Sequence, residues 1–174
     1  MSNIYSTRPD ASEHIPYYSK YISLVPNGNI VTILEEQRQS TPELLRLITE
    51  AQSLNRYAPD KWSIKEVIGH LSDNERIFTY RALRLARNDR TALPGYESDD
   101  YIEYGEFDKR TWQELITEFQ TVRAATVSLY QSLDEVAWTR TGVANNDPIS
   151  VRAIAYVIAG HELHHLKLIK DFYL

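Results

Sequence analysis

The segment WSIKEVIGHLSDNERIFTYRALRLARN, residues 62–88, carries a clear helical pattern. Ser63 is followed three residues later by Glu66, which is the spacing of a capping box at a helix N-terminus. Apolar side chains then recur every three or four residues, at Ile64, Val67, Ile68, Leu71, Ile77, Phe78 and Leu85. Because this period places them on one helix face, the segment predicts a long helix that packs against a core and ends near Asn88.

Three further stretches of the chain show the same period. In the first of them, Pro42 predicts a kink or a restart. Between the third and fourth predicted helices, the segment TRTGVANNDP (139–148) is polar and shows no convincing strand pattern. We therefore expect an all-α fold, a four-helix bundle. The predicted helices span residues 29–52, 63–88, 109–132 and 150–172.

Two segments lie outside these helices. Residues 1–28 contain three prolines and a cluster of tyrosines, and we expect them to form an extended N-terminal strap. Residues 89–108 connect the second and third helices with seven acidic side chains and no sustained period. This connection is longer than an antiparallel helical hairpin requires. It predicts either a crossing of the bundle that makes its flanking helices parallel, or a lid over a site.

Length and composition exclude several classes of protein. The 174 residues are expected to form a single domain, 1–174, and an apolar content of 43% can supply its core. The net charge is −5 and no basic run is present, so we expect no nucleic-acid partner. We find no signal peptide and no span for a membrane, which indicates a cytoplasmic protein. The absence of cysteine excludes disulfides, thiolate ligands and a protein thiol nucleophile.

Three of the five histidines fall on the predicted inner faces of two helices. His161 and His165 are four residues apart on the apolar stripe of the last helix, with Cβ atoms about 6 Å apart. His70 lies on the inner stripe of the second helix. Hydrogen-bonded core histidines are the simpler interpretation, but burying unpaired imidazoles is costly. The pattern favours a metal site of three imidazoles with a position open to water.

The letters H-E-L-H-H at 161–165 also match the H-E-x-x-H motif of zinc peptidases. Such enzymes commonly take a third ligand further along the chain, and the residues LKLIKDFYL after His165 provide none. A peptidase is therefore not expected. Glu162 remains the candidate catalytic residue, as a base acting on metal-bound water. The alternative, which the sequence narrowly favours, is that Glu162 is a solvent-facing helix residue.

Other polar residues of the second helix have two interpretations each. Asp73, three residues after His70, is either a partner that orients the imidazole or, more simply, a charge on the helix face. Asn74 is the better candidate for a polar group that lines a pocket. Trp62, at the helix start, is explained by packing. A basic strip near the helix end either forms ion pairs with the acidic connection or binds an anionic substrate; it consists of Arg81, Arg84 and Arg87.

The segments WSIKEVIGHLSDNER (62–76) and GHELHHLKLI (160–169), with the four-helix layout, resemble the DinB/YfiT-like superfamily. This group contains DinB-like proteins and bacillithiol S-transferases. The resemblance covers the chain from about residue 30 to its end. The family's metal triad falls on His70, His161 and His165, and all three are present. The resemblance implies a divalent ion, zinc or nickel in relatives, with positions open to water or a thiolate.

The resemblance also implies an activity and a partner. Known activities in the superfamily are thiol transfer and thiol-assisted isomerisation of small-molecule substrates, and members often form homodimers. Because this chain has no cysteine, an external low-molecular-weight thiol would supply the nucleophile. Two alternatives stay open: hydrolysis by metal-bound hydroxide, and a non-catalytic metal-binding bundle with a structural or partner-binding role. Three imidazoles suit zinc, nickel, iron and copper alike, so the ligand set does not select the metal.

Overall fold

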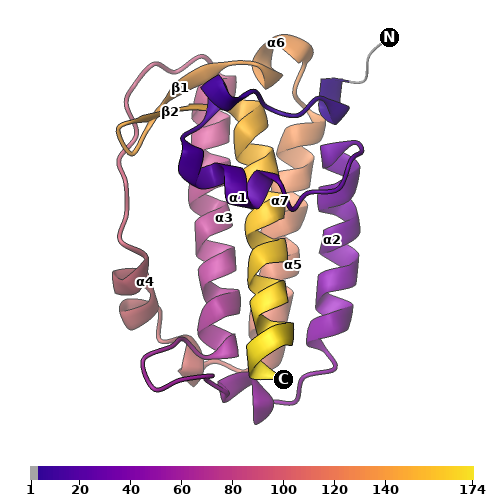
Figure 1. Ribbon diagram of the computed structural model, residues 1–174, viewed down its shortest axis with the longest axis vertical. Helices are drawn as coiled ribbons and strands as arrows, with labels where there is room; N and C mark the ends of the chain where they lie inside the picture. Colours follow the sequence, from indigo (N-terminus) through magenta and orange to yellow (C-terminus); the bar gives the residue numbers. More distant parts are fainter. Residues whose placement is uncertain (1–3) are drawn as a thin grey trace.

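The computed structural model describes residues 4–174, and four long helices form its body (Figure 1). These are α2 (Ile30–Leu45), α3 (Ile64–Ala86), α5 (Trp112–Gln131) and α7 (Val151–Leu168). α2 and α3 each pack against both α5 and α7, so α2 and α3 lie at opposite corners of the bundle. No helix among the described residues combines the length and the hydropathy that a membrane crossing requires.

Each long helix begins at a side chain that accepts hydrogen bonds from the free backbone N–H groups of its first turn. Two of these caps are capping boxes: the predicted one, closed by Glu66, and a second one, closed by Glu114. The capping side chains are those of Asn29, Ser63, Thr111 and Ser150. The helix starts are therefore encoded locally, as the sequence indicates.

The first long helix is shorter than predicted. Pro42 lies in the last turn of α2, and the helix ends at Leu45 instead of residue 52. Proline cannot donate a backbone hydrogen bond to the preceding turn, so it weakens the helix at this point. A turn and the short 3₁₀ helix η4 (Gln52–Leu54) follow.

The acidic connection returns along the outside of the bundle (Figure 1). It leaves the C-terminal end of α3 and comes back to its N-terminal end, where Ser63 donates a hydrogen bond to Asp108 (2.5 Å). α3 and α5 consequently run parallel, which is one of the two arrangements that the sequence predicts. The connection contains helical turns that the sequence pattern does not predict, namely α4 (Ser98–Gly105) and η5 (Phe107–Lys109).

The segment predicted as a polar loop forms a β-hairpin, so the expectation of no strand is wrong. β1 (Thr141–Ala144) pairs antiparallel with β2 (Asp147–Ser150). The turn residues Asn145 and Asn146 have φ of 54° and 67°, and asparagine tolerates this left-handed region in a two-residue hairpin turn. α6 (Glu135–Trp138) precedes the hairpin.

The N-terminal strap is not extended, which corrects a second expectation. From residue 4 onward it is a series of short helical turns, and residues 1–3 lie outside the described part. It ends in a helix that crosses α7 (Figure 1). Its elements are η1 (Ile4–Ser6), η2 (Ala11–Glu13), η3 (Pro16–Tyr18) and α1 (Ser19–Ile22).

The crossing of α1 over α7 depends on Gly160. A Cβ atom at this position would lie 2.0 Å from the backbone oxygen of Tyr21, a distance that real Cβ contacts do not reach. The two backbones can therefore approach only because residue 160 has no side chain. This contact brings the strap against the helix that carries His161.

A buried polar layer divides the core into two apolar clusters. In every long helix a buried polar residue falls between members of the two clusters. The central residue is Arg123, which donates to both carboxylate oxygens of Glu75 at 2.7 and 2.8 Å and to Gln37 at 3.2 Å. It also forms an ion pair with Glu162 at 2.7 Å. One guanidinium thus joins α5 to α2, α3 and α7 at the middle of the bundle.

Removal of the Arg123 charge should destabilise the protein strongly. Arg123→Met leaves two carboxylates in the core without their cation, and we expect a loss of about 3–5 kcal/mol in the free energy of unfolding. The matched control is Arg76→Met on α3, whose ion pairs with Asp73 and Glu118 are at the surface and contribute at most about 1 kcal/mol. Urea unfolding followed by circular dichroism measures both. Equal losses in the two variants would contradict the central role of Arg123.

Gly160→Ala should also destabilise the fold, although alanine is the better helix former. At an exposed helical position this change would stabilise by about 1 kcal/mol. Here the added methyl group meets the Tyr21 backbone, and overpacking typically costs about 1–3 kcal/mol. The control is Ser128→Ala on the exposed face of α5, which should leave stability unchanged or higher. A melting temperature of Gly160→Ala above that of the wild type would rule out the close crossing.

Candidate metal centre

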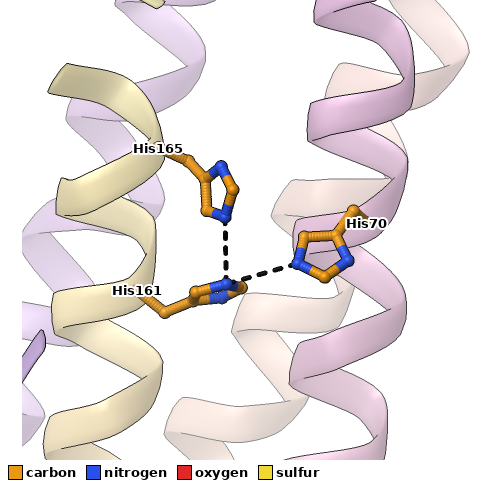
Figure 2. Close-up of side chains that lie close together, drawn as sticks. All are labelled: His70, His161 and His165. Carbon is orange, nitrogen blue, oxygen red and sulfur yellow. Dashed lines mark hydrogen bonds between the residues drawn. The ribbon is translucent and has the colours of Figure 1, made fainter. Parts of the chain in front are cut away.

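Three imidazoles meet between α3 and α7. His70 projects from α3, and His161 and His165 project from successive turns of α7, with the three rings facing one another (Figure 2). The Nε2 atom of His161 lies 3.3 Å from Nε2 of His70 and 3.0 Å from Nε2 of His165. The three candidate ligand nitrogens all lie within 4.8 Å of one another.

This nitrogen cluster fits a metal ion better than it fits a purely structural role. Zinc–imidazole bonds of about 2.0–2.1 Å in a tetrahedron place ligand nitrogens about 3.3 Å apart, close to the two shorter separations found here. Without a metal, the Nε2 atom of His161 would face two other ring nitrogens with at most one proton to share with them. The donor set and its spacing therefore suit a divalent ion with further positions for other ligands.

Burial keeps the three imidazoles neutral at physiological pH. Loss of hydration lowers the pKa of His70 to about 4, an effect that the Asp99 carboxylate opposes. Burial, followed by the neighbouring His70 and His164, lowers the pKa of His165 to about 3. Burial, followed by the neighbouring His165 and His70, also lowers the pKa of His161 well below its usual range. Neutral imidazole is the form that binds metals.

Aromatic side chains hold two of the rings in place. The Trp62 ring lies 4.8 Å from the His70 ring between their centroids, tilted by 52°. Tyr21, from α1, meets the His161 ring edge-on at 5.1 Å. These contacts restrict rotation of the imidazoles and exclude water from one side of each. Tyr21 reaches this position because of the close crossing at Gly160.

The three histidines line a cavity of about 410 Å³. Protein pockets for small ligands commonly span about 300–1,000 Å³, so the cavity can hold a small organic molecule. Its other walls come from the strap, from α3, from the acidic connection and from the hairpin. They include Tyr18, Lys20, Tyr21, Asn74, Arg81 and Tyr96.

The acidic connection supplies part of the cavity wall, in agreement with its second predicted arrangement. The Asn74 amide donates a hydrogen bond to the Tyr96 hydroxyl (2.6 Å), which fixes the connection against α3 beside the histidines. Tyr101 packs edge-on against the Tyr96 ring at 4.9 Å. Asn74 therefore lines the cavity, as the sequence indicates. The connection both crosses the bundle and covers one side of the site.

Glu162, the candidate catalytic base, does not reach the cavity. Its side chain is 1% exposed, so the solvent-facing alternative is wrong. The carboxylate points into the bundle, where Thr41 donates a hydrogen bond to it and Arg123 forms an ion pair with it. Adjacent residues on a helix point about 100° apart, and this separates Glu162 from His161. The structure therefore places this carboxylate in the buried polar layer and not beside the three histidines.

Further predicted residues have distinct positions. Asp73 forms an ion pair with Arg76 at 3.1 Å, which agrees with a charge on the helix face. His164 lines the cavity but is not one of the three converging rings. Within the basic strip, Arg84 pairs with Asp89 of the connection. Arg81 instead lines the cavity.

Sequence reasoning missed several residues around the site. The sequence explains Trp62 by packing alone, and it places Lys20 and Tyr21 in an extended strap, yet all three line the cavity. A tyrosine cluster between prolines was the only local signal for the strap residues. Their place in the cavity depends on the crossing of α1 over α7, for which the sequence has no periodic pattern.

The sequence and the fold are similar to those of known proteins. Residues 33–169 match the DinB superfamily. No curated protein sequence matches this chain significantly. Among solved structures, YfiT from Bacillus subtilis has a TM-score of 0.74 at 16% identity, covering 98% of this chain and 95% of its own. It is described as a probable metal-dependent hydrolase with an unusual four-helix bundle topology.

Two other solved structures share the fold. The mycothiol-dependent maleylpyruvate isomerase matches with a TM-score of 0.66 and 13% identity, over 87% of this chain but only 66% of its own length. The DinB-like protein YjoA from Bacillus subtilis matches with a TM-score of 0.59 and 18% identity, over 84% of this chain and 90% of its own. At such identities the structural likeness establishes the fold alone. The family match spans most of the sequence, and the chain belongs to the DinB superfamily.

Proposed function

We propose that this protein is a divalent-metal-dependent enzyme that uses an external thiol to attack a small electrophilic molecule. The observation that carries the proposal is the convergence of three neutral imidazoles, two buried and one half-buried, at the wall of a cavity. Histidines that served packing alone would not need to face a space of about 410 Å³. The thiol-dependent isomerase with this fold supports the choice of a thiol.

In this proposal the protein's own residues hold and shield the reacting groups. His70, His161 and His165 hold the ion, while Trp62 and Tyr21 limit the rotation of the rings and exclude water. A bound divalent ion supplies positive charge that favours the thiolate form of an incoming thiol. In the transfer, the thiol loses its proton to solvent and a carbon–sulfur bond forms. The leaving group departs with the electron pair of the bond that breaks.

Hydrolysis is the second candidate, favoured by the likeness to YfiT over nearly the whole chain. The same three histidines would then serve a reaction in which water replaces the thiol as the nucleophile. Glu162 is not available as the base in either reaction, because its carboxylate is bound by Arg123 and Thr41. Zinc and nickel are the ions that we propose first, because the resemblance to the DinB/YfiT-like superfamily implies them and three imidazole ligands suit both.

The proposed site predicts about one divalent ion per chain, lost on removal of a single ligand. His70→Ala or His165→Ala should reduce bound metal by at least about tenfold, because loss of a residue that merely hydrogen-bonds to a metal ligand already costs about that much affinity. His164→Ala is the matched control, because this ring borders the cavity without joining the three nitrogens. Plasma mass spectrometry of untagged protein gives the metal content, and circular dichroism verifies the fold. Full metal content in a His161→Ala/His165→Ala double variant would refute the site.

Activity should depend on the thiol and on the histidines together. With metal-loaded protein, conjugation of a chromogenic aryl halide to small thiols should exceed the uncatalysed rate by at least about tenfold, and His70→Ala should abolish this excess. Absorbance of the conjugate measures the rate. Ester hydrolysis without thiol conjugation would favour the second candidate. Neither activity across a panel of thiols and esters would favour a non-catalytic metal-binding bundle.

A further inference from the structure

We propose that the cavity binds its ligand through a carboxylate group, and that Arg81 recognises this carboxylate at the end of the cavity remote from the three histidines. This inference depends on the proposed function in one respect, namely which chemical group of the ligand lies at the three histidines. The anion-binding role itself follows from the burial, the partners and the surroundings of Arg81.

Arg81 is a buried cation without a counter-ion. Its side chain is 4% exposed, and its guanidinium group lies over the Phe78 ring at 5.1 Å. The group donates one hydrogen bond, to the backbone oxygen of Pro94 (2.7 Å). Among the described residues it forms no ion pair. Because buried charges in proteins are normally paired, the unpaired Arg81 charge favours the binding of an anion that is not part of the chain.

Arg123 shows how the same chain treats a buried guanidinium that has only a structural role. Arg123 is surrounded by the carboxylates of Glu75 and Glu162. Tyr18 and Tyr96, which line the same cavity, are the ionisable side chains near enough to interact with the Arg81 charge, and no carboxylate is among them. A guanidinium group has five N–H donors in a planar fork that matches a carboxylate. Arg81 therefore has donors left for a ligand.

The cavity as a whole is positively charged in an acidic protein. Its lining contains Lys20 and Arg81 and, within the described chain, no Asp or Glu, although the protein has 24 acidic residues against 19 basic ones. A neighbouring cavity of about 340 Å³ shares Trp62 and His165 with it and is lined by Asp60 and Asp99. Acidic groups are thus present near the histidines but are absent from the larger cavity. This distribution favours an anionic ligand there.

The spacing of Arg81 and His70 sets the shape of the ligand. Both residues belong to α3 and are eleven positions apart, about 16 Å along the helix axis. Both side chains line the same cavity, so the ligand is elongated and spans less than this distance. Asn74 and Tyr96 line the same cavity, and Asn74 lies on α3 between these two residues. The ligand that fits carries its reacting group at the histidines and its carboxylate at Arg81.

A length-matched pair of thiols tests the inference on metal-loaded protein. Cobalt(II) in the three-histidine site gives a change in visible absorption when a thiol binds, so dissociation constants can be measured for 6-mercaptohexanoate and for the neutral 6-mercaptohexan-1-ol. We expect the wild type to bind the carboxylate at least about tenfold more tightly. Arg81→Gln should remove this preference. Arg84→Gln, on the same helix but paired with Asp89, should retain it.

The wild-type comparison decides the matter even if Arg81→Gln does not fold. Equal affinity of the wild type for the two thiols would overturn the inference while leaving the metal site intact. Arg81→Lys, which keeps the charge but loses the planar fork, should retain part of the preference. A preference that survives unchanged in a folded Arg81→Gln variant would also overturn it.

Heptanoate, which lacks the thiol, separates the two sources of the carboxylate. Binding of heptanoate in the presence of saturating 6-mercaptohexan-1-ol assigns the carboxylate to the second substrate. Competition between heptanoate and 6-mercaptohexan-1-ol instead assigns the carboxylate to the thiol substrate. If the protein takes up no metal, the proposed function fails, and a calorimetric titration with heptanoate still tests Arg81. Binding lost in Arg81→Gln would support the inference, and the absence of binding to the wild type would contradict it.

Discussion

The buried guanidinium of Arg123 is the contact on which the rest of the structure depends. It lies where no water can replace a missing partner, and its carboxylate and amide partners come from the three other long helices. Apolar side chains could pack in several registers, whereas these directional hydrogen bonds are satisfied in one. Because Arg123 fixes the direction of Glu162, the adjacent His161 points about 100° away around α7, toward His70 of α3.

Two structural constraints therefore position the residues of the site. The polar layer sets the rotation of α7, and the close crossing at Gly160 sets the position of the strap above it. Together they place Tyr21 against His161 and bring Lys20 to the cavity wall. Arg123, Glu162 and Gly160, which set these two constraints, do not line the cavity themselves. The shape of the cavity therefore depends in part on residues that would not contact a ligand.

The sequence predicts what is encoded by local period and spacing. The four helices, their capping side chains, the three histidines and the pocket-lining Asn74 all follow from patterns within single helices. The hairpin and the turns of the strap do not follow from such a pattern. The break in the first helix does, because Pro42 weakens its last turn, but the exact end at Leu45 does not. Glu162 illustrates the limit of such patterns. Its place beside His161 in the H-E-x-x-H motif suggests a base that acts on metal-bound water, but the guanidinium that binds its carboxylate belongs to Arg123, 39 positions earlier in the chain.

The parallel course of α3 and α5 also affects how the chain reaches its fold. An up-and-down bundle can form through hairpins of consecutive helices, each closed by a short loop. Here α3 can pack against α5 only after residues 87–111 have returned along the bundle. The pairing of α3 with α5 therefore requires the closure of a long loop, which costs chain entropy. Folding rates fall as native contacts become less local. This topology therefore implies slower folding than in an up-and-down bundle of the same length, with α3–α5 docking a late event.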